Sequence, residues 1–265
     1  MDSFKIQIEN EDEGIYLDAY LPCECKKNKK AMLVIPGGGY MSWADREGEP
    51  IAKAFCEYGF SSFVLHYYVG REKPFPIQLI QAQKAIKHIK DNAKVYGINP
   101  DEVFAVGFSA GGHLAGSCAI LNNIPAVYES IDMPYGYTNL KGAMLIYPVV
   151  SAKYHTSSFK NLLCSSTPTD EELKAVSLEE QVTESSAPVF IMHTSNDSTV
   201  DVRSSLVLAE AYSRAKIQYE MHIYPDAPHG IALATPLTSC ERAVWENKRI
   251  AEWVRLASEW TDEIK

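Results

Sequence analysis

The chain has 265 residues, of which 46% are hydrophobic and 22% are charged. This composition is typical of a globular protein and excludes a largely disordered chain. The 34 acidic residues outnumber the 25 basic residues, which gives a formal net charge of -9 at pH 7. An acidic protein repels phosphate backbones, so we expect that nucleic acid is not a partner. The short lysine cluster at 26–30 is expected to be a solvated turn.

The first residues contain no basic region followed by an apolar run, and no apolar stretch approaches the roughly 20 residues of a membrane span. We therefore expect a cytoplasmic protein that does not bind a membrane, with its six scattered cysteines reduced. Cys23 and Cys25 form a close pair, but no second pair matches them, which favours free thiols over a zinc site. We expect no metal and no cofactor.

The first two predicted strands, at 4–8 and 14–20, alternate between apolar and polar residues, as half-exposed antiparallel strands do. Later runs are short and continuously apolar, and they lie at 32–35, 62–65, 103–106, 143–146 and 189–192. Such runs are typical of central strands in a parallel sheet that is covered on both faces.

Helical segments lie between and after these runs, at 50–58, 76–96, 114–121, 201–215 and 240–260. Gly59 and Gly97 follow the first two segments, as expected for glycines at helix C-termini. In the last segment, an apolar stripe that includes Trp245 and Trp253 is expected to pack against the domain. Strands followed by alternating strands and helices predict an α/β fold with an antiparallel edge.

Two stretches interrupt this alternation, at 122–140 and at 151–186, and the second contains a short helical piece at 169–175. Long irregular connections often cover a functional site, although a surface excursion without function is the alternative. We expect a single domain over 1–265 with cap-like insertions near 122–140 and 151–186.

Residues 107–112 read Gly-Phe-Ser-Ala-Gly-Gly, and they connect the strand at 103–106 to an apolar helix. A Gly-x-Ser-x-Gly string alone is weak evidence, but a strand-to-helix turn holds its serine in a strained conformation that the glycines permit. The start of the helix also presents free N–H groups. This context predicts that Ser109 is a catalytic nucleophile.

Residues 36–40 read Pro-Gly-Gly-Gly-Tyr and directly follow the strand at 32–35. Consecutive glycines let a loop approach a ligand closely and point N–H groups at it. A phosphate loop is excluded because neither its Lys-Ser/Thr ending nor the dinucleotide spacing is present. We expect the N–H groups of Gly38, Gly39 and Ala110 to form an oxyanion hole, with the Tyr40 N–H as an alternative. Tyr40 is also a candidate substrate-binding residue.

A serine nucleophile needs a neutral base, and the chain has seven histidines. His229 lies between a proline and a glycine in a loop after the strand-like segment 219–224, which suits a base that reaches Ser109. His193 is the rival, but it ends an apolar strand, where structural histidines are common. His113 lies on the helix that follows the serine and is expected to point away from it. The other histidines lack a comparable context.

The base in turn needs a buried carboxylate to orient it. Asp197 lies in the loop at the carboxyl end of the strand at 189–192 and is the predicted acid. Asp201 remains an alternative, although it is expected to cap the following helix. Asp226 is too close in sequence to His229 to be the first choice.

These motifs resemble the α/β-hydrolase superfamily, and within it the small esterase/lipase group that includes acetyl esterases and acetyl-xylan-esterase-like proteins. The resemblance extends from about residue 35 to 253, and it rests on the motifs at 36–40, 107–115, 193–197 and 228–230. The order serine, aspartate, histidine is that of this superfamily. Two features depart from the usual pattern: Pro36 replaces a histidine before the glycines, and His66-Tyr67-Tyr68 stands where many relatives show Tyr-Arg.

The resemblance implies an α/β-hydrolase fold with a mostly parallel central sheet, antiparallel N-terminal strands and helices on both faces. It also implies a serine carboxylesterase that hydrolyses short-chain acyl esters, notably acetyl esters of sugars or xylo-oligosaccharides, through an acyl-enzyme. Its partner would be a small-molecule ester, and a homo-oligomer stays open. In the first insertion, Tyr128, Tyr135 and Tyr137 would either stack on a sugar ring or serve in packing.

Two other function classes stay open from the sequence. One is an amidase or exopeptidase-type serine hydrolase on the same fold. The other is a non-catalytic ligand-binding homologue, because a fold alone does not determine function.

Overall fold

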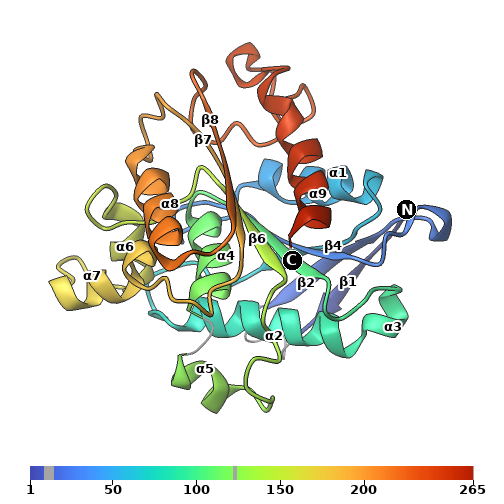
Figure 1. The fold of residues 1–265 in the computed structure, drawn as a ribbon, viewed down its shortest axis with the longest axis horizontal. Helices are drawn as coiled ribbons and strands as arrows, with labels where there is room; N and C mark the ends of the chain where they lie inside the picture. Colours follow the sequence, from blue (N-terminus) through green and yellow to red (C-terminus); the bar gives the residue numbers. More distant parts are fainter. Residues whose placement is uncertain (9–14, 122–123, 265) are drawn as a thin grey trace.

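The computed structural model describes residues 1–8, 15–121 and 124–264, and an eight-stranded sheet forms the centre of this part of the chain (Figure 1). The strands are β1 (Asp2–Gln7), β2 (Tyr16–Leu21), β3 (Ala31–Ile35), β4 (Ser61–His66), β5 (Val103–Phe108), β6 (Gly142–Ile146), β7 (Val189–Thr194) and β8 (Tyr219–Tyr224). Every predicted strand is present, although Gly14, the first residue of the second prediction, lies outside the described residues.

The strands follow the spatial order β1-β2-β4-β3-β5-β6-β7-β8. The pairs β1–β2 and β2–β4 are antiparallel, and all the other pairs are parallel. The predicted antiparallel edge is therefore confirmed. Because β3 and β5 to β8 run parallel, their carboxyl ends meet at one edge of the sheet.

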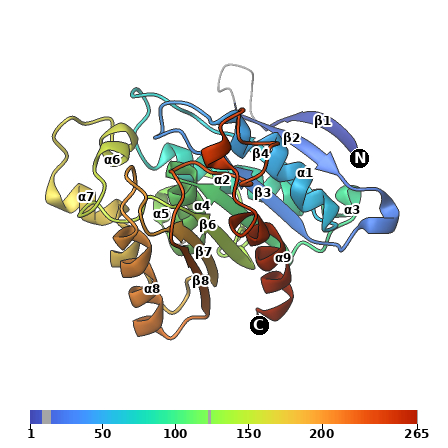
Figure 2. The same ribbon diagram turned by 90° about the horizontal axis from the view of Figure 1, so that it is seen from above.

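Helices cover both faces of the sheet (Figure 2). The helices packed on one face are α1 (Glu49–Glu57) and α9 (Trp253–Glu263). Those on the other face are α2 (Ile77–Asp91), α4 (Ala110–Ile120) and α8 (Arg203–Ala215). A short helix, α3 (Ala93–Tyr96), follows α2.

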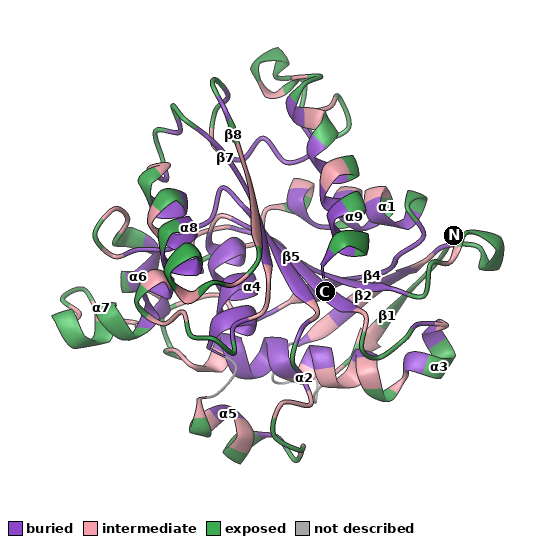
Figure 3. Ribbon diagram, viewed as in Figure 1, coloured by how far each residue is buried: buried purple, intermediate pink, exposed green. Residues whose placement is uncertain are grey.

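Two apolar cores result from this layering, one on each face. In β5, Val103 and Ala105 belong to the core under α2 and α4, whereas Phe104 and Val106 belong to the core under α1 and α9. Both sets of side chains are buried, so the strand is apolar along its whole length. Figure 3 shows the same burial along the neighbouring central strands.

Two predicted helices differ from the structure. The segment at 76–96 divides into α2 and α3 at Asn92, whose side-chain amide donates to the carbonyl of His88. The expected helix at 240–260 begins only at Trp253, after two short 3₁₀ turns, Ala243–Trp245 and Ile250–Glu252. In the irregular part, the Asn247 side chain accepts the N–H groups of residues 249 and 250, which offers the backbone an alternative to a helix.

The two insertions lie at different places. The first contains α5 (Pro125–Ser130), which packs beside α2, while residues 122 and 123 lie outside the described part (Figure 1). The second contains α6 (Ser157–Leu162) and α7 (Asp170–Val176). The predicted helical piece at 169–175 corresponds to α7. At the start of this helix, Thr169 and Glu172 form a reciprocal capping box.

Candidate active site

The predicted site residues come from loops that leave the carboxyl edge of the sheet. Ser109 directly follows β5, Asp197 follows β7, and His229 lies in the loop after β8. The glycine loop that begins at Gly37 follows β3 in the same way. Parallel strands of an open α/β sheet place their ligand sites at this edge, so residues distant in sequence meet there.

Ser109 sits in a sharp turn between β5 and α4, with a φ of 53° that side-chain-bearing residues rarely adopt. The turn is tight because its glycines touch the backbone around them. A Cβ at Gly107 would lie 2.1 Å from the carbonyl oxygen of Gly111, and a Cβ at Gly111 would lie 2.2 Å from that of Ile35. These glycines therefore allow the strained turn that exposes the Ser109 hydroxyl to the cavity.

The structure brings Ser109, His229 and Asp197 into one hydrogen-bonded chain. His229 Nε2 lies 2.9 Å from Ser109 Oγ, and His229 Nδ1 lies 2.6 Å from Asp197 Oδ2. An ionised carboxylate only accepts hydrogen bonds, so Nδ1 carries the proton and Nε2 is free to accept the serine proton. This is the geometry that a serine nucleophile with a histidine base requires.

Asp197 is held as a buried carboxylate, with 8% of its surface exposed. Its Oδ1 accepts the N–H groups of Thr199 and Val200 at 2.8 and 3.0 Å, while His193 Nε2 lies 3.4 Å from its Oδ2. Burial alone would raise the pKa of Asp197, but the hydrogen bonds from His193, His229 and the backbone outweigh it and hold the pKa well below its ordinary value. Asp197 therefore stays ionised beside the base.

The rival residues have other roles. His193 is buried, and its ring contacts the Val200 carbonyl through Nε2 and the Ser205 hydroxyl through Nδ1. Asp201 accepts the N–H of Arg203, the first residue of α8, as expected of a residue at a helix start. The Asp226 carboxylate accepts a hydrogen bond from the Asn196 side chain.

The glycine loop presents unpaired N–H groups to the site. No described residue accepts a hydrogen bond from the N–H of Gly38, Gly39 or Ala110. Gly38 has a φ of +135°, and a Cβ there would lie 2.1 Å from the Ser42 carbonyl oxygen. Only glycine fits this turn, which leaves the loop backbone beside Ser109.

Three side chains anchor this loop. The Tyr67 hydroxyl donates to the Pro36 carbonyl at 2.8 Å, and Asn161 Nδ2 donates to the Gly39 carbonyl at 2.8 Å. Glu47 Oε2 accepts the Gly37 N–H at 2.9 Å. Tyr67 belongs to the segment 66–68 that departs from the usual Tyr-Arg, so this segment takes part in holding the loop that begins after Pro36.

Tyr40 is not among the residues that line the cavity beside Ser109, and its role in substrate binding stays a prediction. Its backbone has a φ of 64°, and its side chain is fully buried under the loop. The Tyr40 hydroxyl lies 2.6 Å from His113 Nδ1, and His113 Nε2 lies 2.7 Å from the Val176 carbonyl. Burial lowers the pKa of His113 to about 4, so the ring is neutral. Its Nε2 donates a hydrogen bond to the Val176 carbonyl, and its Nδ1 accepts one from the Tyr40 hydroxyl. Tyr40 and His113 thus form a buried structural pair, and His113 points away from Ser109 as predicted.

A cavity of about 300 Å³ opens over Ser109 and His229. Its wall combines polar and apolar surface, and it is lined by Gly38, Gly39, Ala44, Arg46, Glu47, Ser109, His155, Ser157, Ser158, Asn161, Thr199 and His229. The second insertion therefore contributes part of this wall through α6 and the residues before it.

Several polar cavity residues were not predicted from the sequence, among them Arg46, Glu47, His155 and Asn161. The charged run 45–47 is of a kind that usually marks a solvated surface, and 155–161 lies in an irregular polar stretch without periodicity. A single sequence holds no signal that brings either segment to the cavity.

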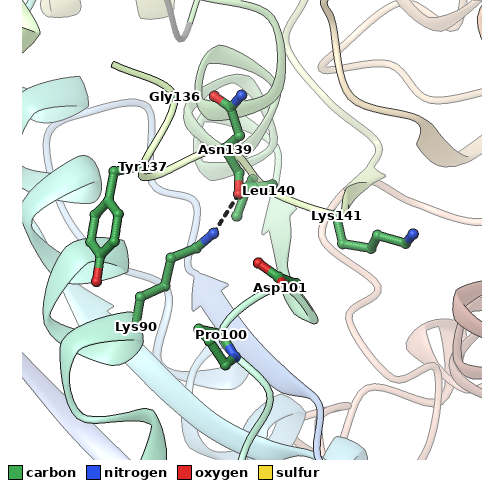
Figure 4. A pocket seen from close by; sticks show the side chains of 8 residues that line it. All are labelled: Lys90, Pro100, Asp101, Gly136, Tyr137, Asn139, Leu140 and Lys141. Carbon is green, nitrogen blue, oxygen red and sulfur yellow. Dashed lines mark hydrogen bonds between the residues drawn. The ribbon is translucent and has the colours of Figure 1, made fainter. Parts of the chain in front are cut away.

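Another cavity lies at the opposite edge of the sheet, between α2 and the first insertion (Figure 4). Tyr137 lines it and donates to Asp91 of α2 at 2.6 Å, while Tyr128 and Tyr135 stack on each other with centroids 5.0 Å apart. None of the three tyrosines lines the catalytic cavity. Tyr135 is 71% exposed, so sugar stacking and packing both stay open for these tyrosines, away from the cavity at Ser109.

Among the residues that the structure describes, no helix has the length and apolar character that a membrane crossing requires. The same residues contain no group of three or more His, Cys, Asp or Glu side chains arranged to hold a metal ion.

Similarity to known proteins extends over most of the chain. The chain is 36% identical over 82% of its length to endo-1,4-beta-xylanase B of Butyrivibrio fibrisolvens. It is 26% identical over 87% of its length to an acetylxylan esterase of Xylanibacter ruminicola. These matches cover only 35% and 47% of the two relatives. A solved structure, the acetyl ester-xyloside bifunctional hydrolase of Caldicellulosiruptor lactoaceticus, superposes with a TM-score of 0.83 at 30% identity and covers 98% of this chain and 96% of that one.

The BD-FAE family model matches residues 17–212, a range that includes the glycine loop, Ser109 and Asp197. The solved neighbours include an α/β-hydrolase enzyme from a Medee basin deep-sea metagenome library, with a TM-score of 0.80 at 30% identity over 100% of this chain and 98% of that one. With a central sheet of the same kind and the serine turn at its carboxyl edge, the chain belongs to the BD-FAE family and has the α/β-hydrolase fold.

Proposed function

We propose that this chain is a serine carboxylesterase that hydrolyses short-chain acyl esters, in particular acetyl esters of sugars or xylo-oligosaccharides. One observation carries the proposal: Ser109 Oγ, His229 and Asp197 form a continuous hydrogen-bonded chain, with separations of 2.9 and 2.6 Å. The similarity to enzymes that are named esterases and hydrolases supports the same reaction class.

In the proposed acylation step, Ser109 Oγ attacks the ester carbonyl carbon and its proton moves to His229 Nε2. The carbonyl oxygen becomes an oxyanion that accepts hydrogen bonds from the N–H groups of Gly38, Gly39 and Ala110. When the carbon–oxygen bond to the alcohol breaks, His229 returns the proton to the leaving oxygen. Asp197 holds the ring orientation and stabilises the imidazolium throughout.

Deacylation repeats these events with water. His229 takes a proton from the water as the water oxygen attacks the acyl carbon, and the same N–H groups hold the second oxyanion. Collapse of this intermediate breaks the bond to Ser109 Oγ, which regains its proton from His229, and the free acid leaves. Every proton is transferred through His229 Nε2, so both acylation and deacylation require a neutral imidazole at their start.

The cavity supports a small acyl group and a polar alcohol. Its volume of about 300 Å³ is at the low end for a ligand site, and Ser157, Ser158 and Asn161 offer hydrogen-bonding groups along the wall. A long acyl chain would leave such groups without partners, which costs binding free energy. Three relatives that are named for xylan, acetylxylan or acetyl ester-xyloside substrates further support a sugar as the alcohol part.

The test compares turnover of acetylated xylo-oligosaccharides with turnover of long-chain acyl esters and of acyl amides. We expect the acetylated sugars to have the highest kcat/KM. A preference for amides would favour the amidase alternative, and a preference for long chains would exclude the short-chain assignment.

A fluorophosphonate probe tests the nucleophile independently of the substrate. Wild-type protein is expected to be labelled, and Ser109→Ala is expected to lose the label. Ser117→Ala is the matched control, because Ser117 is a buried serine of α4 whose hydroxyl donates to the His113 carbonyl. A folded wild-type protein without labelling would favour the non-catalytic binding class.

A further inference from the structure

Glu47 is a buried carboxylate in the wall of the catalytic cavity that the proposed mechanism does not use. Only 2% of its surface is exposed, yet no described Lys, Arg or His side chain forms an ion pair with it. An unpaired buried carboxylate is costly, so glutamate is rarely found there without a compensating role. This cost is the first indication that Glu47 serves the site.

Each Glu47 oxygen holds a different loop of the active site. Oε2 accepts the Gly37 N–H at 2.9 Å, and Oε1 accepts the Tyr147 hydroxyl at 2.9 Å. Tyr147 directly follows β6, and its oxygen also accepts the N–H of Ala232 at 3.1 Å. One carboxylate thus connects the glycine loop after β3 with the histidine loop after β8.

Tyr147 also contacts the base. Its ring meets the ring of His229 edge to face, with centroids 5.0 Å apart and an interplanar angle of 65°. The bond from Gly37 holds the first peptide of the loop, next to Gly38 and Gly39, whose N–H groups donate to no described residue. A Cβ at Gly37 would lie 2.8 Å from Glu47 Oε2, so glycine at this position makes the bond possible.

We propose that Glu47 is a positioning residue of the active site, which holds the oxyanion loop and the histidine loop in register. This inference rests on the proposed function. The carboxylate acts through Gly37 and Tyr147 and through its charge, and it does not touch the substrate carbonyl in the mechanism above.

The electrostatic part follows from the groups around the histidine. The charged and titratable groups that face or adjoin His229 are Asp197, Glu47, His155, His193, Tyr147 and Arg46. Burial raises the pKa of Glu47, whereas the Gly37 N–H, the Arg46 guanidinium and the Tyr147 hydroxyl oppose that rise. Glu47 and His229 interact electrostatically, so removal of the Glu47 carboxylate changes the electrostatic environment of the base.

The test uses Glu47→Gln, which keeps the shape and removes the charge, and Tyr147→Phe, which keeps the ring and removes one link. We expect Glu47→Gln to lower kcat by about 10- to 100-fold with KM nearly unchanged, because both loops lose their alignment. The acid limb of its kcat/KM profile should move to lower pH by about one unit. Combined, the two substitutions should cost less than the sum of their separate effects.

Glu49→Gln is the matched control, since Glu49 is two residues away and pairs with Lys53 on the surface. We expect its kcat and pH profile to match wild type. A purely structural Glu47 would lower the yield of folded protein or its thermal stability, but it would not move the acid limb. Circular dichroism and thermal unfolding of each variant separate that case.

The inference and the proposed function fail in different ways. If Glu47→Gln hydrolyses esters and reacts with fluorophosphonate like wild type over the same pH range, the role of Glu47 is refuted and the esterase stands. If wild-type protein hydrolyses no ester, the rate of fluorophosphonate labelling of Ser109 still tests Glu47. An unchanged acid limb of that rate in Glu47→Gln refutes the inference as well.

Discussion

Replacement of Asp197 by asparagine tests the proposed mechanism most directly, because the structure fixes which way the new amide must face. Its Oδ1 position accepts two backbone N–H groups, from Thr199 and Val200, at 2.8 and 3.0 Å. In Asp197→Asn the amide oxygen has to keep those bonds. The amide nitrogen then occupies the position of Oδ2, which lies 2.6 Å from His229 Nδ1.

A donor at that position selects the wrong tautomer of the base. His229 Nδ1 must accept from the amide, so the ring proton moves to Nε2, which then donates to Ser109 Oγ instead of accepting from it. The serine cannot lose its proton to that ring. In serine hydrolases such a change lowers kcat by about 10⁴-fold, which corresponds to about 5 kcal/mol of transition-state stabilisation.

The assay is steady-state hydrolysis of an acetylated xylo-oligosaccharide by wild type, Asp197→Asn and the control Asp201→Asn. Asp201 carries the same side chain four residues later, but it pairs with Arg203 at the surface. We expect Asp201→Asn to retain turnover within about twofold, since surface substitutions rarely exceed ~0.5 kcal/mol. Near wild-type turnover of folded Asp197→Asn, or an equal loss in both variants, would refute the reasoning.

Three further predictions concern the loop, the buried pair and acid stability. Gly38→Ala should lose both activity and at least about 2 kcal/mol of stability, because its Cβ would lie 2.1 Å from the Ser42 carbonyl oxygen; wild-type turnover and melting temperature would contradict this. Tyr40→Phe should cost about 1–3 kcal/mol of unfolding free energy by leaving His113 Nδ1 unpaired, with KM unchanged, and a raised KM instead would support Tyr40 as a substrate contact. The lowered pKa of Asp197 contributes stability above the ordinary pKa of about 3.9, and this is lost as the pH falls toward the folded-state pKa. Urea unfolding should therefore show wild type progressively losing its advantage over Asp197→Asn as the pH falls below about 4, and a difference that stays constant would count against this reasoning.

Much of the fold was predictable because the strand signal is strong. Continuous apolar runs such as 103–106 occur where both faces of a strand are covered, and few other structures use them. The three proposed catalytic residues could be found for a related reason. Each follows a predicted strand, and a parallel sheet brings such positions to one edge.

The remaining differences have physical causes. Val244 lies within the stripe predicted at 240–260, but it is 70% exposed, whereas Trp245 packs on Arg46, whose Cζ lies 4.3 Å from the ring centroid. Hydrophobic periodicity does not identify such a partner. The positive φ of Tyr40 turns its side chain beneath the loop, which no pattern of neighbouring residues reveals.

Glu47 was not predicted from the sequence. A glutamate in a charged run is ordinarily solvated, so burial through bonds to Gly37 and Tyr147 depends on tertiary contacts 10 and 100 positions away. The role of Glu47 can therefore be inferred only from the folded structure.

The anchoring of Gly39 by Asn161 has a consequence for how such an enzyme is diversified. The proposed catalytic residues belong to loops that follow β5, β7 and β8, whereas α6 supplies both part of the cavity wall and one support of the glycine loop. Substitutions at positions 155, 157 and 158 would thus change which alcohol part of the ester is accepted, while the geometry of Ser109, His229 and Asp197 is kept. A library confined to those three positions, with Asn161 held constant, would sample new ester preferences at little risk to turnover.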